Sequence, residues 1–222
     1  MSNPFSDIQL IVFDLDGTLV NSQFDLLDAV NYALGKLDKS PIEQEQITGM
    51  LGGGIRQLIS LALGQNAEPA FSKAFELFKQ HYSKHFANKT KPYPGVPETL
   101  AALSSYKKAV LSNKAHPFTV QIIRKTGLER HFELVLGAQP DKYALKPSPE
   151  GLRYILQELN ISSRQALMVG DSTHDIEAAK ALNMKTCAVT YGYRPTDLLK
   201  RAKPDVLIKQ MQDLRELLLH SK

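Results

Sequence analysis

The chain has 222 residues, of which 43% are hydrophobic and 23% charged, a composition typical of a globular protein with a buried core. Its apolar runs are too short to span a bilayer, Met1–Asp7 lacks the features of a signal peptide, and the single cysteine, Cys187, excludes an internal disulfide. We therefore expect a cytoplasmic protein. The net charge of +4 comes from scattered lysines, so we expect neither a nucleic-acid nor a membrane partner.

The first predicted element is a strand at Leu10–Phe13. Four consecutive apolar residues suit a strand that is buried on both faces of a parallel sheet. Asp14 and Asp16 follow at its carboxyl end, where open α/β sheets bind their ligands. Two carboxylates this close repel each other unless a cation is present, and oxygen ligands suit Mg2+. One acid could act as a nucleophile and the other could transfer protons, although a bare D-x-D pair is also common as a solvated strand end.

The next segment is helical in pattern. Apolar residues keep the i, i+3, i+4 spacing of amphipathic helices in three stretches, Phe24–Leu37, Ile55–Leu63 and Ala70–Phe86. Prolines and a glycine in Lys91–Gly95 then predict a stiff turn. These features indicate an all-helical cap of residues 20–89, inserted directly after the acidic loop.

Strands and helices alternate through the rest of the chain. The predicted strands are Lys108–Ser112, Glu133–Gly137, Ala166–Gly170, Thr186–Thr190 and Val206–Ile208. The predicted helices lie near Pro117–Thr126, Pro149–Leu159 and Asp175–Leu182, with a closing helix at Arg215–His220. This alternation predicts an α/β fold, a doubly wound, Rossmann-like parallel sheet. We expect residues 1–19 and 90–222 to form that core.

Three further polar clusters follow predicted strands. Ser112 and Asn113 offer a hydroxyl, an amide and backbone N–H groups for phosphoryl oxygens. Lys146 is held on a proline-rich segment, where its ammonium could neutralise phosphoryl charge. Asp171 suits a metal, and Asp175 could orient Lys146 or the waters of the metal. Taken singly, a strand-end turn, a solvated lysine and a helix-start acid are ordinary features.

Together, these motifs resemble the haloacid dehalogenase superfamily and, within it, the phosphoglycolate phosphatases. They stand in the superfamily's order, with D-L-D-G-T-L from Asp14, S-N at Ser112, K-P-S-P from Lys146 and G-D-S-T-H-D from Gly170. The helical insertion matches the small cap that follows the first motif in that superfamily. The stretch from M-V-G-D-S to A-L-N-M, followed by T-Y-G-Y, is most like phosphoglycolate phosphatases. Asn21 stands where those proteins often have aspartate, outside the catalytic set.

The resemblance implies a Mg2+-dependent phosphatase that works through an aspartyl-phosphate, with 2-phosphoglycolate as the expected substrate. Asp14 would be the nucleophile, and Asp16 would be the general acid and base. Mg2+ would be held by Asp14, by the backbone carbonyl of Asp16, and by Asp171.

The resemblance also implies how the phosphoryl group is held. Ser112, Asn113 and Lys146 would contact it, and Lys146 would stabilise its charge during transfer. Asp175 would steady Lys146 and the metal surroundings, and Thr18, which completes the first motif, would support the site.

Specificity would lie in the cap. The N–H groups of Gly53 and Gly54, together with Arg56, could bind a carboxylate, and this loop resembles the specificity loop of such caps. A plain interhelical turn is an equal alternative. The two crossings near Leu19–Ser22 and Asn88–Pro94 would act as hinges.

Other functions remain open from the sequence. The substrate could be pyrophosphate, a nucleotide or a sugar phosphate. A phosphomutase could use the same scaffold, although the hexose phosphomutases carry a cap histidine where this chain has Leu26. A receiver-like or non-catalytic phosphate-binding module is a different class of candidate. We expect a small phosphorylated metabolite as partner, and either a monomer or a homodimer.

Overall fold

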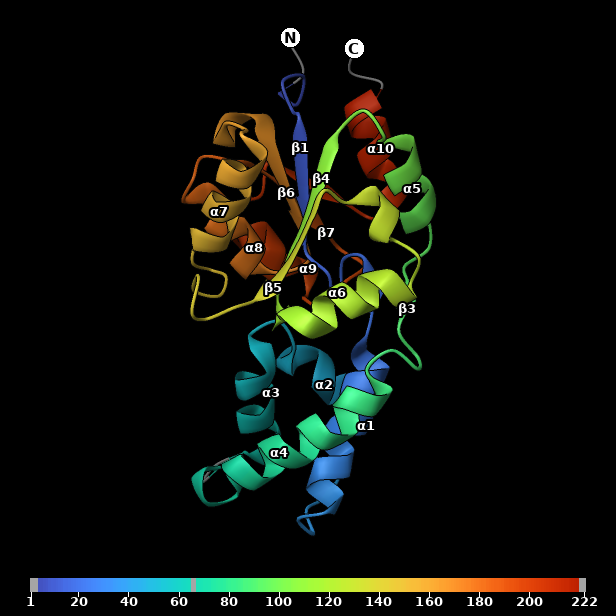
Figure 1. Ribbon diagram of the computed structural model, residues 1–222, viewed down its shortest axis with the longest axis vertical. Coiled ribbons are helices and arrows are strands. Elements are labelled where there is room, and N and C mark those ends of the chain that lie inside the picture. Colours follow the sequence, from blue (N-terminus) through green and yellow to red (C-terminus); the bar gives the residue numbers. More distant parts are fainter. Residues whose placement is uncertain (1–3, 65–66, 220–222) are drawn as a thin grey trace.

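The computed structural model describes residues 4–64 and 67–219. Figure 1 shows a sheet flanked by helices and, below it, a separate group of helices. In the described residues, no helix combines the length and the apolar character that a membrane crossing requires.

The sheet has six parallel strands in the order β5-β4-β1-β6-β7-β8. Its strands are β1 (Leu10–Phe13), β4 (Lys107–Ala115), β5 (Leu134–Ala138), β6 (Ala166–Gly170), β7 (Lys185–Val189) and β8 (Val206–Ile208). The predicted doubly wound α/β fold is confirmed. Because β1 is central, with β4 and β6 as its neighbours, the carboxyl ends of these three strands meet at one edge of the sheet.

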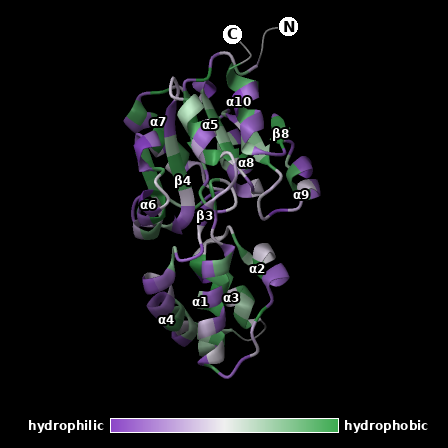
Figure 2. Ribbon diagram, turned by 90° about the vertical axis from the view of Figure 1, so that its right-hand side faces the viewer, coloured by the Kyte–Doolittle hydropathy of each residue, from purple (hydrophilic) through white to green (hydrophobic). Residues whose placement is uncertain are grey.

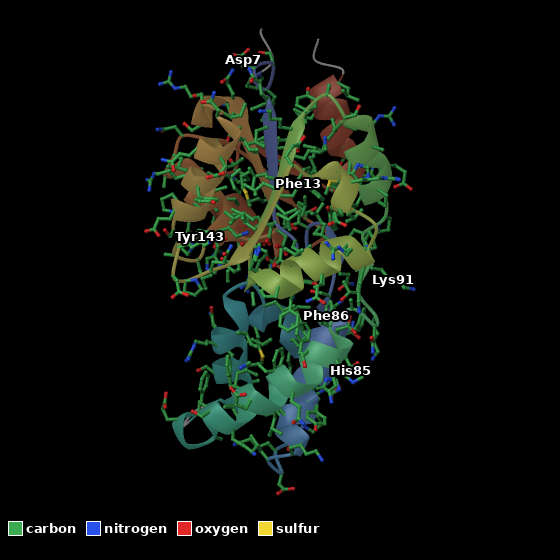
Figure 3. All side chains as sticks on the ribbon, viewed as in Figure 1. Asp7, Phe13, His85, Phe86, Lys91 and Tyr143 are labelled. Atoms are coloured by element: carbon green, nitrogen blue, oxygen red, sulfur yellow. The ribbon has the colours of Figure 1, made fainter. Side chains whose placement is uncertain are left out.

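The two faces of the sheet explain why β1 is apolar throughout. Ile11 and Phe13 point to the face that is covered by α5 (Val96–Ala102), α6 (His116–Lys125) and α10 (Met211–Leu219). Leu10 and Val12 point to the face that is covered by α7 (Glu150–Leu159) and α8 (Thr173–Lys180). Figure 3 shows Phe13 in the middle of this layered core. A strand that is buried on both faces needs apolar residues at every position.

Within residues 4–64 and 67–219, four helices make up the lower group. They are α1 (Gln23–Gly35), α2 (Gln44–Met50), α3 (Gly54–Leu63) and α4 (Glu68–His85). Helices are confirmed in the three predicted stretches, whereas α2 was not predicted because Ile47 is its only buried residue. Figure 2 shows this group below the sheet-containing part, joined to it by narrow connections.

The base of the helical group is a small antiparallel ladder. The insertion begins with β2 (Val20–Asn21), which pairs with β3 (Lys91–Pro92) where the chain returns, so this part of the insertion is not helical. Asp25, on the first turn of α1, adds a second connection. Its buried carboxylate accepts hydrogen bonds from the backbone N–H groups of Lys89 and Thr90, and from the Thr90 hydroxyl at 2.6 Å.

Two other helices were not predicted, α5 and α9 (Thr196–Arg201). Both are short, and prolines at their starts read as turns in the sequence. The closing helix α10 begins at Met211, four residues before the predicted start. His220, its predicted end, lies outside the described residues.

Candidate active site

The site forms at the turn that follows β1. Asp14 continues the strand, and its backbone N–H donates to the carbonyl of Val169 on β6. Gly17 has a φ of +83°, and a Cβ there would lie 2.2 Å from Oδ2 of Asp171. A side chain at position 17 would therefore be strained and would displace Asp171. The turn also separates the two acids of the motif, because Asp14 faces Lys146 and Asp16 faces Lys114.

Lys146 lies at the centre of the buried charges. Its Nζ is 2.9 Å from Oδ1 of Asp14 and 2.6 Å from Oδ1 of Asp175, and it donates to the carbonyl of Leu111 at 2.7 Å. An ammonium has three N–H donors, so these partners use all of them. Asp175 is fixed in turn, because its other oxygen accepts from the backbone N–H and the hydroxyl of Ser172 in the capping box of α8.

A cluster of three buried carboxylates can hold a metal ion. Asp14, Asp171 and Asp175 each offer an oxygen, and these oxygens lie within 4.8 Å of one another. The ammonium of Lys146 contacts two of these carboxylates, those of Asp14 and Asp175. The cluster therefore combines three negative charges with one positive charge. Burial raises the pKa of Asp14 to about 7, and burial and the nearby Asp14 raise the pKa of Asp171 well above its usual value. Oxygen ligands and uncompensated negative charge fit a hard divalent cation such as Mg2+.

The metal and phosphate candidates predicted from sequence converge at this edge. Ser112 and Asn113 are buried at the end of β4, next to Lys146. The Asn113 side chain, however, is used within the protein. Its Oδ1 accepts from the backbone N–H of Lys146 at 2.8 Å, and its Nδ2 donates to the carbonyls of Lys146 and Gly52. The side-chain amide of Asn113 is therefore not free to bind a phosphoryl oxygen.

Asp16 belongs to a second charged pair. Its Oδ2 is 2.9 Å from Nζ of Lys114, and its Oδ1 accepts a short hydrogen bond from the Ser22 hydroxyl. Lys114 lies against α4, with its Nζ 5.3 Å from the ring centroid of Tyr82. Lys114 was not among the predicted site residues. It directly follows Ser112 and Asn113 at the end of a buried strand, and that position was the available signal.

The T-Y-G-Y segment after β7 supports the turn from the other side, which the sequence did not indicate. The backbone N–H of Tyr193 donates to Oδ2 of Asp171 at 2.7 Å, and its hydroxyl accepts from the backbone N–H of Ser22. The Tyr191 hydroxyl donates to the carbonyl of Thr18 at 2.8 Å. Thr18 itself is fully buried, and its hydroxyl has no hydrogen-bond partner in residues 4–64 and 67–219.

A cavity opens between the acidic turn and the helical group. Its polar lining comes from the core: Asp14, Asp16, Ser112, Asn113, Lys114, Lys146 and Ser172. Its remaining lining is mostly apolar and includes Leu26, Leu51, Ile55, Leu58, Phe78, Tyr82 and Phe118. Figure 3 places Phe86 on the side of the helical group that faces α6, and its ring is 5.4 Å from that of Phe118.

The predicted specificity loop lies only partly at this cavity. Gly52 and Gly54 line it, whereas Gly53 and Arg56 do not. The guanidinium of Arg56 instead stacks over the rings of Phe71 and Phe75, 5.6 and 5.4 Å from their centroids. The expectation that Arg56 contacts a substrate carboxylate therefore stays a prediction, and this structure places the guanidinium away from the cavity. Two aromatic rings on α4 offer a cation a favourable surface that the sequence spacing did not reveal.

Hydrogen bonds beside the cavity also connect the α/β core to the helical group. Arg194, which follows the T-Y-G-Y segment, donates to the carbonyls of Gly49 and Leu51 between α2 and α3. Together with the contact from Asn113 to Gly52, these bonds fix the loop that forms one wall of the cavity.

Residues 11–189 match the family model described as haloacid dehalogenase-like hydrolase. A phosphoglycolate phosphatase of Vibrio parahaemolyticus is 34% identical, over 95% of this chain and 96% of that protein. One of Psychrobacter arcticus is 36% identical, over 96% of each. A crystal structure of a predicted phosphoglycolate phosphatase from Haemophilus somnus superposes with a TM-score of 0.87 at 30% identity, covering 95% of this chain and 98% of that one.

Proposed function

The chain belongs to the haloacid dehalogenase-like hydrolase family and is a phosphoric monoester hydrolase, and we propose that it hydrolyses 2-phosphoglycolate with Mg2+ through an aspartyl-phosphate. The observation that carries the reaction mechanism is the contact of Asp14 with Lys146 inside a cluster of three buried carboxylates. A nucleophile, a cation and a candidate metal site then share one edge of the sheet.

Asp14 is the proposed nucleophile. Its carboxylate lines the cavity at the end of β1, and Lys146 contacts its Oδ1, so its second oxygen can attack phosphorus. The P–O bond to the leaving group breaks as the bond to Asp14 forms, and water later hydrolyses the aspartyl-phosphate and releases inorganic phosphate. Phosphoryl transfer depends mainly on positioning and on charge stabilisation, which supports a role for a fixed lysine here.

Asp16 is the proposed general acid and base. It lies on the cavity side of the turn, where Lys114 and Ser22 hold its two oxygens. In this role it gives a proton to the leaving oxygen and later takes one from the attacking water. Ser112 and the backbone N–H of Asn113 are the proposed contacts for the transferring phosphoryl group, and Lys146, which lies beside Asp14, would stabilise its charge.

Mg2+ would be held by Asp14, Asp171 and the backbone carbonyl of Asp16, with Asp175 close by, and it would supply positive charge to the phosphoryl oxygens. The supporting observation is electrostatic, because burial raises the pKa values of Asp14 and Asp171, and the three carboxylates of the cluster share one ammonium, that of Lys146. Thr18, buried beside this turn, is a proposed supporting residue. Residues 20–89 are proposed as a cap, with hinges near the β2–β3 ladder.

The test measures phosphate release from 2-phosphoglycolate, pyrophosphate, hexose phosphates and nucleotides. We expect preference for 2-phosphoglycolate, loss of release in EDTA, and loss in Asp14→Asn. Release from other compounds with the same Mg2+ and Asp14 dependence would keep the mechanism and reject the substrate. No release from any compound would reject the mechanism as well.

A further inference from the structure

We propose that Lys114 and Tyr82 form a subsite for the carboxylate of the substrate, placed on the leaving-group side of the phosphoryl site. This inference rests on the proposed function, since it names the residues that would select a short phosphoryloxy acid. The subsite has one residue from the core, Lys114 at the end of β4, and one from the helical group, Tyr82 on α4.

The first argument concerns which cation can recognise a second negative group. Among the described lining residues of the cavity, Lys114 and Lys146 are the cations. Lys146 already donates to Asp14, Asp175 and the Leu111 carbonyl, and it faces the proposed nucleophile. Lys114 contacts Asp16 and lies close to the Tyr82 hydroxyl, which leaves one of its three donors for a carboxylate beyond the phosphoryl group.

The second argument is the Tyr82 hydroxyl. Tyr82 is 2% exposed and lines the cavity, and its hydroxyl has no hydrogen-bond partner in residues 4–64 and 67–219. An unpartnered buried hydroxyl costs about 1–3 kcal/mol, and because Tyr82 lines the cavity, a bound ligand can supply the missing partner. Burial raises the pKa of Tyr82, and Lys114 is the strongest influence that opposes this, which indicates that the hydroxyl lies near the ammonium.

The third argument is position and surroundings. Lys114 contacts Asp16, the residue proposed to protonate the leaving oxygen, so it lies on the side where the carboxylate of 2-phosphoglycolate, two bonds from that oxygen, would be placed. The walls around Tyr82 are apolar and include Leu26, Ile55, Leu58, Phe78 and Phe118. Such walls offer no hydrogen-bond partners for the hydroxyls of a sugar. The carboxylate of a short acid needs only Lys114 and Tyr82 as partners.

Binding of substrate analogues that are not hydrolysed tests the proposed subsite independently of catalysis. With Mg2+ present, calorimetry compares 3-phosphonopropionate, in which a methylene replaces the bridging oxygen of 2-phosphoglycolate, with propylphosphonate, in which a methyl also replaces the carboxylate. The wild type should bind the first more tightly by a factor of about 10–100, the value of a charge-assisted hydrogen bond. Tyr82→Phe should reduce this preference about tenfold, and Lys114→Met should abolish it.

Two controls match these variants. Tyr154→Phe changes a half-buried tyrosine that does not line the cavity, and Lys125→Met removes an ammonium that stacks on Phe86 from α6. Both should keep the preference of the wild type. Tyr82→Phe keeps the ring and its packing against Phe78 and Phe118, so it also tests the subsite if Lys114→Met fails to fold.

The same contrast applies to turnover, with 2-phosphoglycolate against ethyl phosphate. Equal affinity of the wild type for the two phosphonates, or an equal loss for both ligands in each variant, would overturn the subsite. Neither result would contradict the proposed Mg2+-dependent hydrolysis. Conversely, a retained phosphonate preference without phosphate release from any substrate would reject the proposed function and leave the subsite intact.

Discussion

The guanidinium of Arg194 donates a hydrogen bond of 2.9 Å to the carbonyl oxygen of Gly49, across the boundary between the α/β core and the helical group. A second bond reaches the carbonyl of Leu51, whose side chain lines the cavity. The loop between α2 and α3 is thus held against the core by a side chain that lies 143 residues from Leu51 along the chain.

Loss of this contact should weaken substrate binding. Each hydrogen bond contributes about 0.5–1.5 kcal/mol, so we expect Arg194→Met to raise KM about tenfold and to change kcat less. Steady-state kinetics would measure this, and hydrogen exchange at Gly49–Leu51 would report the freed loop. Arg201→Met, on an exposed turn of α9, is the control. Unchanged KM and unchanged exchange would show that the contact does not fix the loop.

The base of the helical group offers a stability test at Asp25. Asp25→Asn replaces a buried acceptor by an amide whose NH2 group faces backbone N–H donors, so we expect a loss of about 1–3 kcal/mol in the free energy of unfolding. Asp28→Asn is the matched control. Its carboxylate is exposed and pairs with Nζ of Lys89, and such pairs contribute about 0–1 kcal/mol. Equal effects of the two substitutions in urea denaturation would contradict the assigned role of Asp25.

Asn113 should act on the reaction through Lys146. Asn113→Ala removes both hydrogen bonds to the backbone of Lys146, so the ammonium loses its fixed position beside Asp14. We expect kcat/KM to fall about ten- to a hundredfold. In Asn113→Asp, the acceptor for the Lys146 N–H is kept, and a smaller loss is expected in stopped assays of phosphate release. A larger loss in Asn113→Asp than in Asn113→Ala would instead indicate that negative charge at this position is the main effect.

Metal affinity should depend on pH through Asp14. Its pKa is raised from 3.8 to about 7 in the metal-free protein, so the folded state holds this proton more tightly than the unfolded state does. The stabilisation that this proton gives is present at low pH and is lost as the pH rises toward about 7.

Three measurements test this pH dependence of stability and of metal binding. In EDTA, stability should fall between pH 5 and pH 7, and Asp14→Asn should reduce this slope. The affinity for Mg2+ should rise over the same interval, up to about tenfold per pH unit, because the ion replaces the proton. Calorimetric titrations in buffers of different ionisation enthalpy would detect the released proton. An affinity for Mg2+ that does not change between pH 5 and pH 7 would contradict the raised pKa of Asp14.

Local pattern was enough to predict most of the fold. Leu10–Phe13 is apolar at every position because both faces of β1 are covered, and the helices of the insertion repeat apolar residues at helical spacing. Helix α2 could not be predicted in this way, because Ile47 alone is buried and the capping box of Glu43 and Gln46 starts the helix. The β2–β3 ladder depends on two segments about 70 residues apart, which no local pattern reveals.

The sequence predicted the site best where polar residues directly follow a predicted strand. Asp14 and Asp171 directly follow predicted strands, the resemblance to the family added the roles of Lys146 and Asp175, and the structure brings the four residues together. The positions of their supports depend on distant contacts. Tyr193 reaches Ser22 across 171 residues of chain, and neither residue type nor spacing indicates that pairing. For Arg56, a pair of aromatic rings on α4 competes with any ligand for the guanidinium.

The β2–β3 ladder means that the insertion leaves the core and returns to it at neighbouring points. Val20 pairs with Pro92 and Asn21 pairs with Lys91, so the two ends are already joined before the first helix begins. A segment with adjacent ends can be shortened, lengthened or exchanged for another without altering the register of β1 against β4. The helices of the insertion can therefore be exchanged between relatives as a unit, while Asp14, Asp16, Lys114 and Lys146 remain in place at the sheet edge.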